Sequence, residues 1–351
     1  MGERLSLVWL QSGGCGGCTQ SLLCHEPGPV FDALEVAGID LRYHPGLSAP
    51  VGDVIELLDA IADGREPLDI LCIEGAMLRG PHGTGHFHRL GGTGRAMTDW
   101  VARLAPRARY VAAVGSCSAY GGFSATAGNP LDACGLAYDG DTPGGLLGAG
   151  FASAGGLPVI NIAGCPTHPG WVVETLHKLA LEGFAPDELD AYGRPRLYAD
   201  QLVHHGCGRN EFYEFKASAE KASDLGCLME NLGCKGTQAH ADCNLRPWNG
   251  GGSCVKGGYA CISCTEPGFE DPGHPFQETP KVAGIPIGLP TDMPKAWFVA
   301  LAALSKSATP KRVRENATAD HPLVVPALKN VRCQVPFEVM QRRKRSYGAI
   351  G

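Results

Sequence analysis

Short apolar runs punctuate the first half of this chain, and glycine-rich sequence follows each of them. Three such runs span residues 5–10, 110–114 and 157–163, and brief apolar runs bounded by turn residues are typical of strands buried on both faces. Stretches with helical character lie at 91–104 and 171–181. Strands that alternate with helices in this way predict a doubly wound α/β fold with a parallel sheet.

The pattern changes twice along the chain, and we expect a domain boundary near each change. Residues 1–190 carry the α/β pattern, whereas residues 191–305 show little strand periodicity and are rich in Gly, Pro, Asn and Cys. That second region should be irregular and should depend on something other than a large hydrophobic core. Residues 306–351 hold ten Lys or Arg and three Asp or Glu, a net charge of +7 against −6 for the whole chain. We expect this basic extension to be a solvated tail or a segment that orders on a partner.

Composition describes a soluble chain and excludes several kinds of site. The 351 residues are 44% hydrophobic and 19% charged, which suits two domains with a sizeable core, and no apolar stretch is long enough to span a membrane. The glycine-rich SGGCGG at 12–17 lacks the lysine of a phosphate-binding loop. The basic RRKR at 342–345 has no nucleic-acid recognition motif beside it. Neither nucleotide nor nucleic-acid binding is expected.

Fifteen cysteines are the most informative part of the composition. A chain of this size with no secretory leader needs no disulfide framework. Cys15, Cys18, Cys117 and Cys165 each follow one of the apolar runs and sit among glycines. Because the carboxyl ends of parallel strands meet at one edge of a sheet, three strand-to-helix loops would bring these thiolates together. Glycine lets the backbone approach a bulky iron–sulfur cluster closely, whereas the alternative is that these are small buried residues in ordinary turns.

Eight further candidate ligands fall in the irregular region and form two groups of four. With the four cysteines above as the first group, the second group is His204, Cys207, Cys227 and Cys234, and the third is Cys243, Cys254, Cys261 and Cys264. Thiolate is the preferred ligand of iron–sulfur clusters, and imidazole can replace it with a change in potential. Zinc is the competing interpretation, but the long, unequal gaps fit paired zinc knuckles poorly. Three groups of four ligands predict three iron–sulfur clusters and therefore a protein that conducts electrons.

With these motifs, residues 5–305 resemble the small subunit of a nickel–iron hydrogenase. The resemblance implies a flavodoxin-like first domain and an irregular cluster-binding second domain. It implies a proximal 4Fe–4S cluster on C-x-x-C, G-x-C-x-x-x-G-G and G-C-P motifs, matched by Cys15, Cys18, Cys117 and Cys165. It implies a distal 4Fe–4S cluster on H-x-x-C and two more cysteines, matched by His204, Cys207, Cys227 and Cys234. His205 is adjacent to His204 and remains the alternative ligand.

Two departures from the family pattern concern the type of cluster. Oxygen-tolerant membrane-bound relatives have two extra cysteines at the proximal cluster, where this chain has Gly17 and Gly122, so an ordinary 4Fe–4S cube is expected. In many relatives the medial cluster is 3Fe–4S, with a proline near its vacant corner. Cys254 stands about where that proline would be, eleven residues after Cys243. With Cys261 and Cys264 it predicts a 4Fe–4S medial cluster, whereas a free Cys254 thiol would leave a 3Fe–4S cluster.

The resemblance also concerns what lies outside this chain. The nickel–iron centre that splits hydrogen belongs to a separate large subunit, so no catalytic residue is expected in this one. Glu74 follows a strand and, by family analogy, lies near the proximal cluster, where it either assists proton or electron coupling or caps local structure.

Details of the sequence resemble one branch of the family most. The cytoplasmic hydrogen-sensing branch is most similar in the segments EGAMLRGPHGTG and ADQLVHHGC and in the basic extension. The resemblance implies that the complex signals to a sensor histidine kinase. It also allows a dimer of heterodimers as the assembly. Periplasmic relatives carry a twin-arginine leader, and none precedes the first predicted strand, so a cytoplasmic location is expected. A cytoplasmic uptake hydrogenase that feeds a respiratory acceptor, and a non-catalytic iron–sulfur binding module, are the alternatives.

Overall fold

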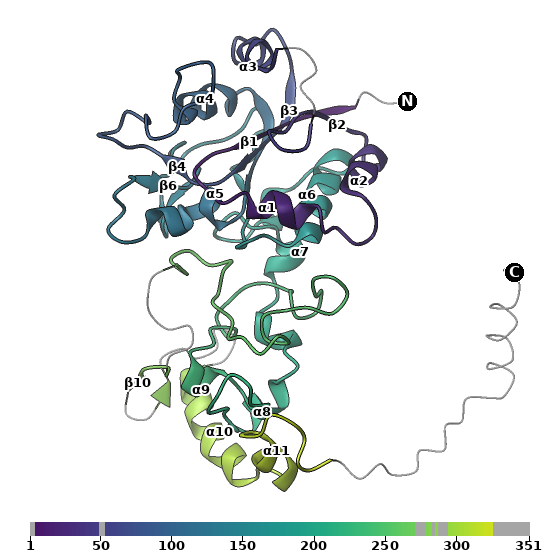
Figure 1. Cartoon of the computed structure of the whole chain (residues 1–351), viewed down its shortest axis with the longest axis vertical. Helices are drawn as coiled ribbons and strands as arrows, with labels where there is room; N and C mark the ends of the chain where they lie inside the picture. Colours follow the sequence, from purple (N-terminus) through teal and green to yellow (C-terminus); the bar gives the residue numbers. More distant parts are fainter. Residues whose placement is uncertain (1–3, 49–52, 271–277, 283–284, 287–293, 326–351) are drawn as a thin grey trace, which may run out of the picture.

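A five-stranded parallel sheet forms the centre of the first lobe in the computed structural model. Its strands are β1 Leu5–Gln11, β2 Ile39–Tyr43, β3 Leu68–Glu74, β5 Ala108–Val114 and β9 Ile160–Ile162. They run in the order β2-β1-β3-β5-β9, which is the 2-1-3-4-5 order of flavodoxin-like sheets. The predicted parallel α/β fold is therefore confirmed. The structure describes residues 4–48, 53–270, 278–282, 285–286 and 294–325, which form two lobes, with the sheet in one of them (Figure 1).

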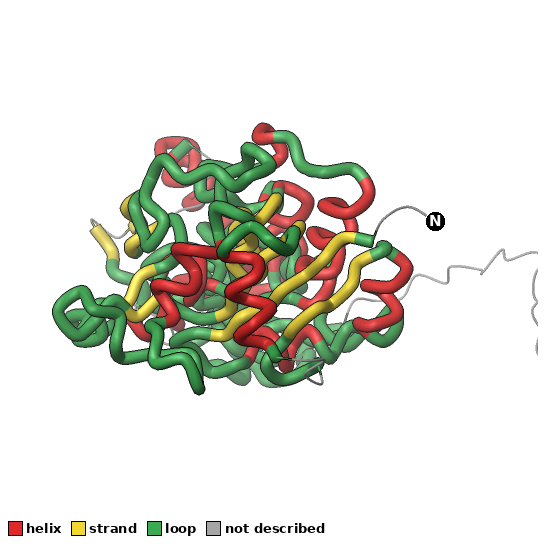
Figure 2. Tube along the Cα trace, turned by 90° about the horizontal axis from the view of Figure 1, so that it is seen from above, coloured by secondary structure: helices red, strands yellow, loops and turns green. Residues whose placement is uncertain are grey.

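Helices cover both faces of this sheet (Figure 2). One face packs against α1 Gly17–Leu22, α2 Val30–Val36 and α6 Pro169–Leu181, and the other against α3 Val54–Ala62 and α4 Met97–Leu104. On β1, Leu7 and Trp9 join the first core, and Val8 and Leu10 join the second. Consecutive residues of the strand are thus all buried, which explains why the strands read as unbroken apolar runs.

Two of the predicted helices begin at other residues than expected. Helix α4 begins at Met97 and not at residue 91, because residues 89–96 close a turn through paired backbones of Arg89 and Ala96. Helix α6 begins at Pro169, where the fixed backbone of proline suits the first helical position. The Nδ1 atom of His168 accepts a hydrogen bond from the Gly170 amide at 3.0 Å and caps this helix.

Short elements occupy the loops at the carboxyl ends of the strands. Helix α5 Ser116–Tyr120 follows β5 directly, and the 3-10 turn η1 Gly122–Ala125 follows α5. The remaining elements of the lobe are β4 Met77–Leu78 paired with β6 Ala133–Cys134, β7 Tyr138–Asp139 paired with β8 Thr142–Pro143, and the 3-10 turn η2 Pro186–Glu188. These loops carry the first group of cysteines.

The second lobe has little regular structure among the described residues 200–270 and 278–282. Its elements there are η3 Val203–Gly206, α8 Asn210–Glu214, α9 Met229–Leu232 and β10 Lys281–Val282, which pairs with β11 Ile285–Pro286; α7 Arg196–Ala199 lies at the junction of the lobes (Figure 1). Its own described apolar clusters are small, and cysteines take part in two of them. These short elements and small clusters match the irregular second domain that the sequence predicts.

The boundary expected after residue 305 falls inside a helix. Helix α10 spans Lys295–Ser307, and α11 Lys311–Asn316 follows it. Val313 of α11 is fully buried against Phe212 and Phe215, and the Ala317 carbonyl accepts a hydrogen bond from the Gly226 amide at 2.9 Å. Residues 306–325 therefore pack as part of the second lobe, because apolar residues spaced among the basic ones give α11 a buried side. Residues 326–351, the rest of the expected extension, lie outside the described part of the chain.

Candidate iron–sulfur centres

The first group of cysteines meets at the carboxyl edge of the sheet. Cys15 lies in the loop after β1 and Cys18 in helix α1, while Cys117 lies in α5 after β5 and Cys165 follows β9. Burial raises the pKa of Cys165 to about 12, and repulsion from Cys117 and Cys15 adds to this effect. The pKa of Cys18 is also raised, first by burial and then by Glu74, Cys117 and Cys165. The four sulfurs thus lie within electrostatic reach of one another.

Glycines beside this group leave room that any side chain would fill. A Cβ atom on Gly115 would lie 2.5 Å from the Cys18 sulfur, and one on Gly122 would lie 2.7 Å from the Cys117 sulfur. Both glycines also have positive φ angles, 89° and 54°, which disfavour other residues. The backbone is therefore shaped so that nothing crowds the cysteine sulfurs, as a bulky inorganic cluster requires.

Glu74 is the last residue of β3 and is held on both carboxylate oxygens. Its Oε1 accepts hydrogen bonds from the amides of Cys18 at 3.0 Å and Thr19 at 3.1 Å, in the first turn of α1. Its Oε2 accepts from the Thr19 hydroxyl, from Gln11 at 3.1 Å and from the Trp9 indole at 3.2 Å. Glu74 therefore caps the helix that carries Cys18, which is the structural one of its two expected roles.

The second group surrounds a cavity in the second lobe. His204, Cys207, Cys227 and Cys234 all line it, together with Tyr213 and Arg209. Burial raises the pKa of Cys227 to about 12, with repulsion from Cys234 and Cys207 also acting on it. Within the described chain, the cavity lining includes His204 but not His205. The Nδ1 atom of His205 instead accepts a hydrogen bond from the Leu202 amide at 3.3 Å.

The third group lines a cavity of about 450 Å³ that also reaches Cys165. Cys243, Cys254, Cys261 and Cys264 all face it. Burial raises the pKa of Cys243 to about 12, and Cys264 and then Cys254 raise it further. Cys254 therefore lines the same cavity as the other three cysteines and lies within electrostatic reach of Cys243 and Cys264.

Backbone contacts join the three groups in a fixed order. The Cys165 amide donates to the Cys264 sulfur, which connects the first group to the third. The Cys261 amide donates to the Cys234 sulfur at 3.3 Å, which connects the third group to the second. The Ser116 hydroxyl donates to the Cys264 carbonyl and accepts from the Gly164 amide at 2.9 Å. The groups thus form a row, with the first group at the sheet edge, the third in the middle of the molecule and the second at the far end of the second lobe.

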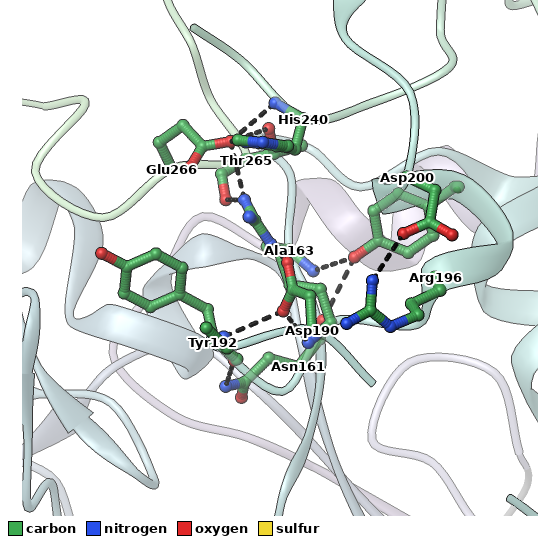
Figure 3. A network of polar contacts seen from close by, with 12 residues as sticks. Asn161, Ala163, Asp190, Tyr192, Arg196, Asp200, His240, Thr265 and Glu266 are labelled. Carbon is green, nitrogen blue, oxygen red and sulfur yellow. Dashed lines mark hydrogen bonds and ion pairs between the residues drawn. The ribbon is translucent and has the colours of Figure 1, made fainter. Parts of the chain in front are cut away.

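A buried charge network holds the two lobes together near this row (Figure 3). Arg194 is only 2% exposed, and its guanidinium contacts Asp190 and Glu266, each at 2.7 Å. The same guanidinium donates to the Thr265 carbonyl at 3.0 Å, and Glu266 accepts from the His240 amide at 2.7 Å. This network fixes the residues that follow Cys264. No motif marks Arg194 in the sequence, because only the fold brings its partners together.

The donor set fits iron–sulfur clusters better than single metal ions. Among the described residues, no three His, Cys, Asp or Glu side chains converge closely enough to hold one ion, as a zinc site would require. Instead the sulfurs surround open space, and backbone amides donate to several of them; examples are Gly17 to Cys15 at 3.3 Å, Arg209 to Cys207 at 3.4 Å and Ser263 to Cys261 at 3.4 Å. Such amide donors tune cluster potentials.

Two family models match this chain, one on each lobe. Residues 15–179 match the NADH ubiquinone oxidoreductase 20 Kd subunit, and residues 199–277 match the C-terminal model of the NiFe/NiFeSe hydrogenase small subunit. The F420 non-reducing hydrogenase II small subunit of Methanosarcina mazei is 32% identical over 328 residues, which cover 85% of this chain and 82% of that protein. The chain belongs to the nickel–iron hydrogenase small subunits. It is therefore a subunit of an oxidoreductase.

Solved structures of this family share the fold. The NiFeSe hydrogenase of Desulfovibrio vulgaris Hildenborough has a chain with a TM-score of 0.66 and 34% identity, and the match covers 79% of this chain and 99% of that one. The actinobacterial-type NiFe hydrogenase of Ralstonia eutropha H16 has a TM-score of 0.70 at 27% identity, with coverage of 94% and 96%. No helix among the described residues of this small subunit is long and apolar enough to cross a membrane.

Proposed function

We propose that this chain transfers electrons away from a nickel–iron centre in a separate large subunit through three 4Fe–4S clusters. The proximal cluster would be held by Cys15, Cys18, Cys117 and Cys165, the medial one by Cys243, Cys254, Cys261 and Cys264, and the distal one by His204, Cys207, Cys227 and Cys234. When bound, the clusters supply one-electron redox steps. The observation that carries the proposal is the row of contacts from Cys165 to Cys264 and from Cys261 to Cys234.

The surface beside the proximal group supports a large-subunit interface there. Cys15 is exposed, and so are the apolar side chains of Leu23, next to helix α1, and Phe123, in the turn after Cys117. Exposed apolar side chains on the elements that carry the cysteines favour a protein interface there. Glu74, buried beneath Cys18, keeps that edge in shape.

An experiment can separate electron transport from the chemistry of hydrogen. The complex with the large subunit should reduce benzyl viologen under hydrogen, whereas this chain alone should not. In the complex, Cys243→Ala interrupts the middle of the row, so viologen reduction should fall by more than tenfold. Isotope exchange between deuterium gas and water needs no electron exit and should persist. Loss of both activities together, with the large subunit still bound and loaded, would contradict the proposed relay.

For the biological role we propose a cytoplasmic hydrogen sensor that signals to a histidine kinase. The basic charge of residues 306–351 supports docking on a partner, and the similarity to the actinobacterial-type hydrogenase extends over 94% of this chain. A chain that ends at Val325 keeps every described contact of the second lobe. It should retain viologen reduction and lose kinase binding in a pull-down. Unchanged kinase binding would show that the kinase docks elsewhere on the complex, and no kinase binding by the full-length complex would favour the uptake role.

A further inference from the structure

A third pocket opens on the surface of the second lobe, and none of the candidate cluster ligands lines it. Its volume is about 320 Å³, which lies at the lower end of the range for small-molecule sites. Three elements form it: the loop after α8, the turn of α9, and the α10–α11 hairpin. The lining residues are Phe215, Lys216, Ala217, Ser218, Glu230, Asn231, Lys306, Thr309, Arg314, Ala317 and Thr318.

Positive charge dominates this pocket, which we call the basic pocket. Lys216, Lys306 and Arg314 line it from three different elements, and Glu230 is its single carboxylate among the described lining residues. Glu230 is itself paired with Lys281 at 3.2 Å and also attracts Lys306, so one carboxylate is shared among several cations. Guanidinium and ammonium groups are the usual donors for carboxylate, phosphate or sulfonate oxygens.

The rest of the lining suits the body of an aromatic ligand. The half-buried ring of Phe215 offers an apolar wall, and the methyl groups of Ala217 and Ala317 continue it. The side chains of Ser218, Thr309 and Asn231 add neutral polar groups around the rim. A pocket with an apolar wall, neutral polar groups and clustered cations fits a small aromatic molecule that carries an anionic group.

One layer of residues separates the basic pocket from the distal ligands. The Cys227 amide donates to the Ala217 carbonyl at 3.0 Å, and the Ala219 amide donates back to the Cys227 carbonyl at 2.9 Å. The Lys216 ammonium lies 4.0 Å from the centre of the Tyr213 ring. That ring packs edge-on against His204, with centroids 5.2 Å apart. A ligand in the pocket would thus lie directly beside the last station of the electron row.

We propose that the basic pocket binds the electron acceptor, a small aromatic two-electron acceptor with an anionic group. This assignment rests on the proposed function of the chain as an electron relay. Hydrogen is the electron source: each molecule yields two electrons and two protons. Two successive one-electron transfers through the distal station reduce one acceptor, which takes up two protons from solvent. Lys306 and Arg314 bind the anionic group, and Phe215 stacks on the aromatic body.

The test uses the purified holoenzyme complex and anthraquinone-2,6-disulfonate as the anionic acceptor. The variant pair Lys306→Gln and Arg314→Gln removes two charges from the pocket while keeping good helix formers in α10 and α11. The matched control, Lys311→Gln with Lys221→Gln, removes two exposed charges that do not line the basic pocket. Binding to the oxidised complex is measured by calorimetry, and hydrogen-driven reduction is measured with the disulfonate and with cationic benzyl viologen.

We expect the pocket variant to raise both the Kd and the KM for the disulfonate by at least about tenfold, since each charged hydrogen bond contributes on the order of a factor of ten. Viologen reduction should stay within about twofold of wild type, and the control should match wild type throughout. Equal effects of the two variant pairs, or no binding of the disulfonate to wild type, would overturn the assignment. If a loaded complex reduces neither dye, the proposed electron relay is wrong. The calorimetric Kd still tests whether the basic pocket binds the disulfonate.

Discussion

Replacing Arg194 by alanine tests how the lobes are held together, because this one side chain contacts both of them. The change removes the ion pairs to Asp190 and Glu266 and the hydrogen bond to the Thr265 carbonyl. Both carboxylates are mostly buried, with side-chain exposures of 14% and 17%. Breaking a buried pair by removing one partner costs about 3–5 kcal/mol.

The lower end of that range applies here, since each carboxylate keeps other donors. Asp190 still accepts from the amides of Tyr192 and residue 194, and Glu266 still accepts from the His240 amide. We therefore expect a loss of about 3 kcal/mol, which corresponds to roughly hundredfold faster opening of the segment around Cys264. Native-state hydrogen exchange of the loaded complex, read on peptides from residues 260–270, measures this rate.

Arg196 provides the matched control, since it lies two residues away and pairs with Asp200 at 2.9 Å in an exposed position. Exposed pairs contribute only about 0–1 kcal/mol, so Arg196→Ala should change exchange by less than about fivefold. Similar exchange in the two variants would refute the role assigned to Arg194.

The effect of Arg194→Ala should also depend on pH in a defined direction. Burial alone would raise the pKa of Glu266, but the hydrogen bond from His240 and the charge of Arg194 lower it overall. A carboxylate whose pKa is lowered by folding stabilises the fold above its unfolded pKa of about 4.3. The stability difference between wild type and variant should therefore be complete at neutral pH and shrink only as the pH falls below about 4.

Three further predictions concern the clusters. Cys254→Ser should convert the medial cluster from four irons to three, which electron paramagnetic resonance would detect as a new 3Fe–4S signal. A wild-type complex that already shows this signal at full occupancy would contradict the assignment. His204→Cys should preserve the distal cluster and lower its potential, since thiolate is anionic and imidazole is neutral, whereas His205→Ala should leave that potential unchanged in a redox titration. Removing iron with a chelator should increase hydrogen exchange in the second lobe while the sheet lobe stays protected, because the second lobe's own apolar clusters are small. Equal protection of both lobes would show a self-sufficient core.

The sequence predicted the sheet well because its strands are buried on both faces. Every residue of an unbroken run such as 110–114 is apolar, and the structure buries this run inside β5. The cysteine positions were predictable for a related reason, since each group's members follow strands or stand in short motifs whose spacing survives in the sequence. The three groups come together in the structure as grouped from the sequence, although their ligation stays a prediction.

What the sequence could not predict depends on contacts between distant segments. In α11, Val313 stands among Lys311, Arg312 and Arg314, so composition alone favours a free basic tail. In the structure, Val313 packs against residues 212–217, and this contact makes α11 part of the second lobe. The role of Arg194 could not be predicted either, because its partner Glu266 is 72 residues away in the sequence. The helical cap supplied by Glu74 depends on β3 lying beside β1.

The most direct test of the electron row is Mössbauer spectroscopy of the iron-57-labelled complex, before and after exposure to hydrogen. Three 4Fe–4S clusters in this subunit predict about twelve irons beyond that of the large subunit's own centre. Hydrogen should reduce clusters at all three sites, and in the Cys243→Ala variant reduction should stop at the proximal site. Fewer than three clusters in fully loaded wild type, or distal reduction that survives loss of the medial site, would contradict the account.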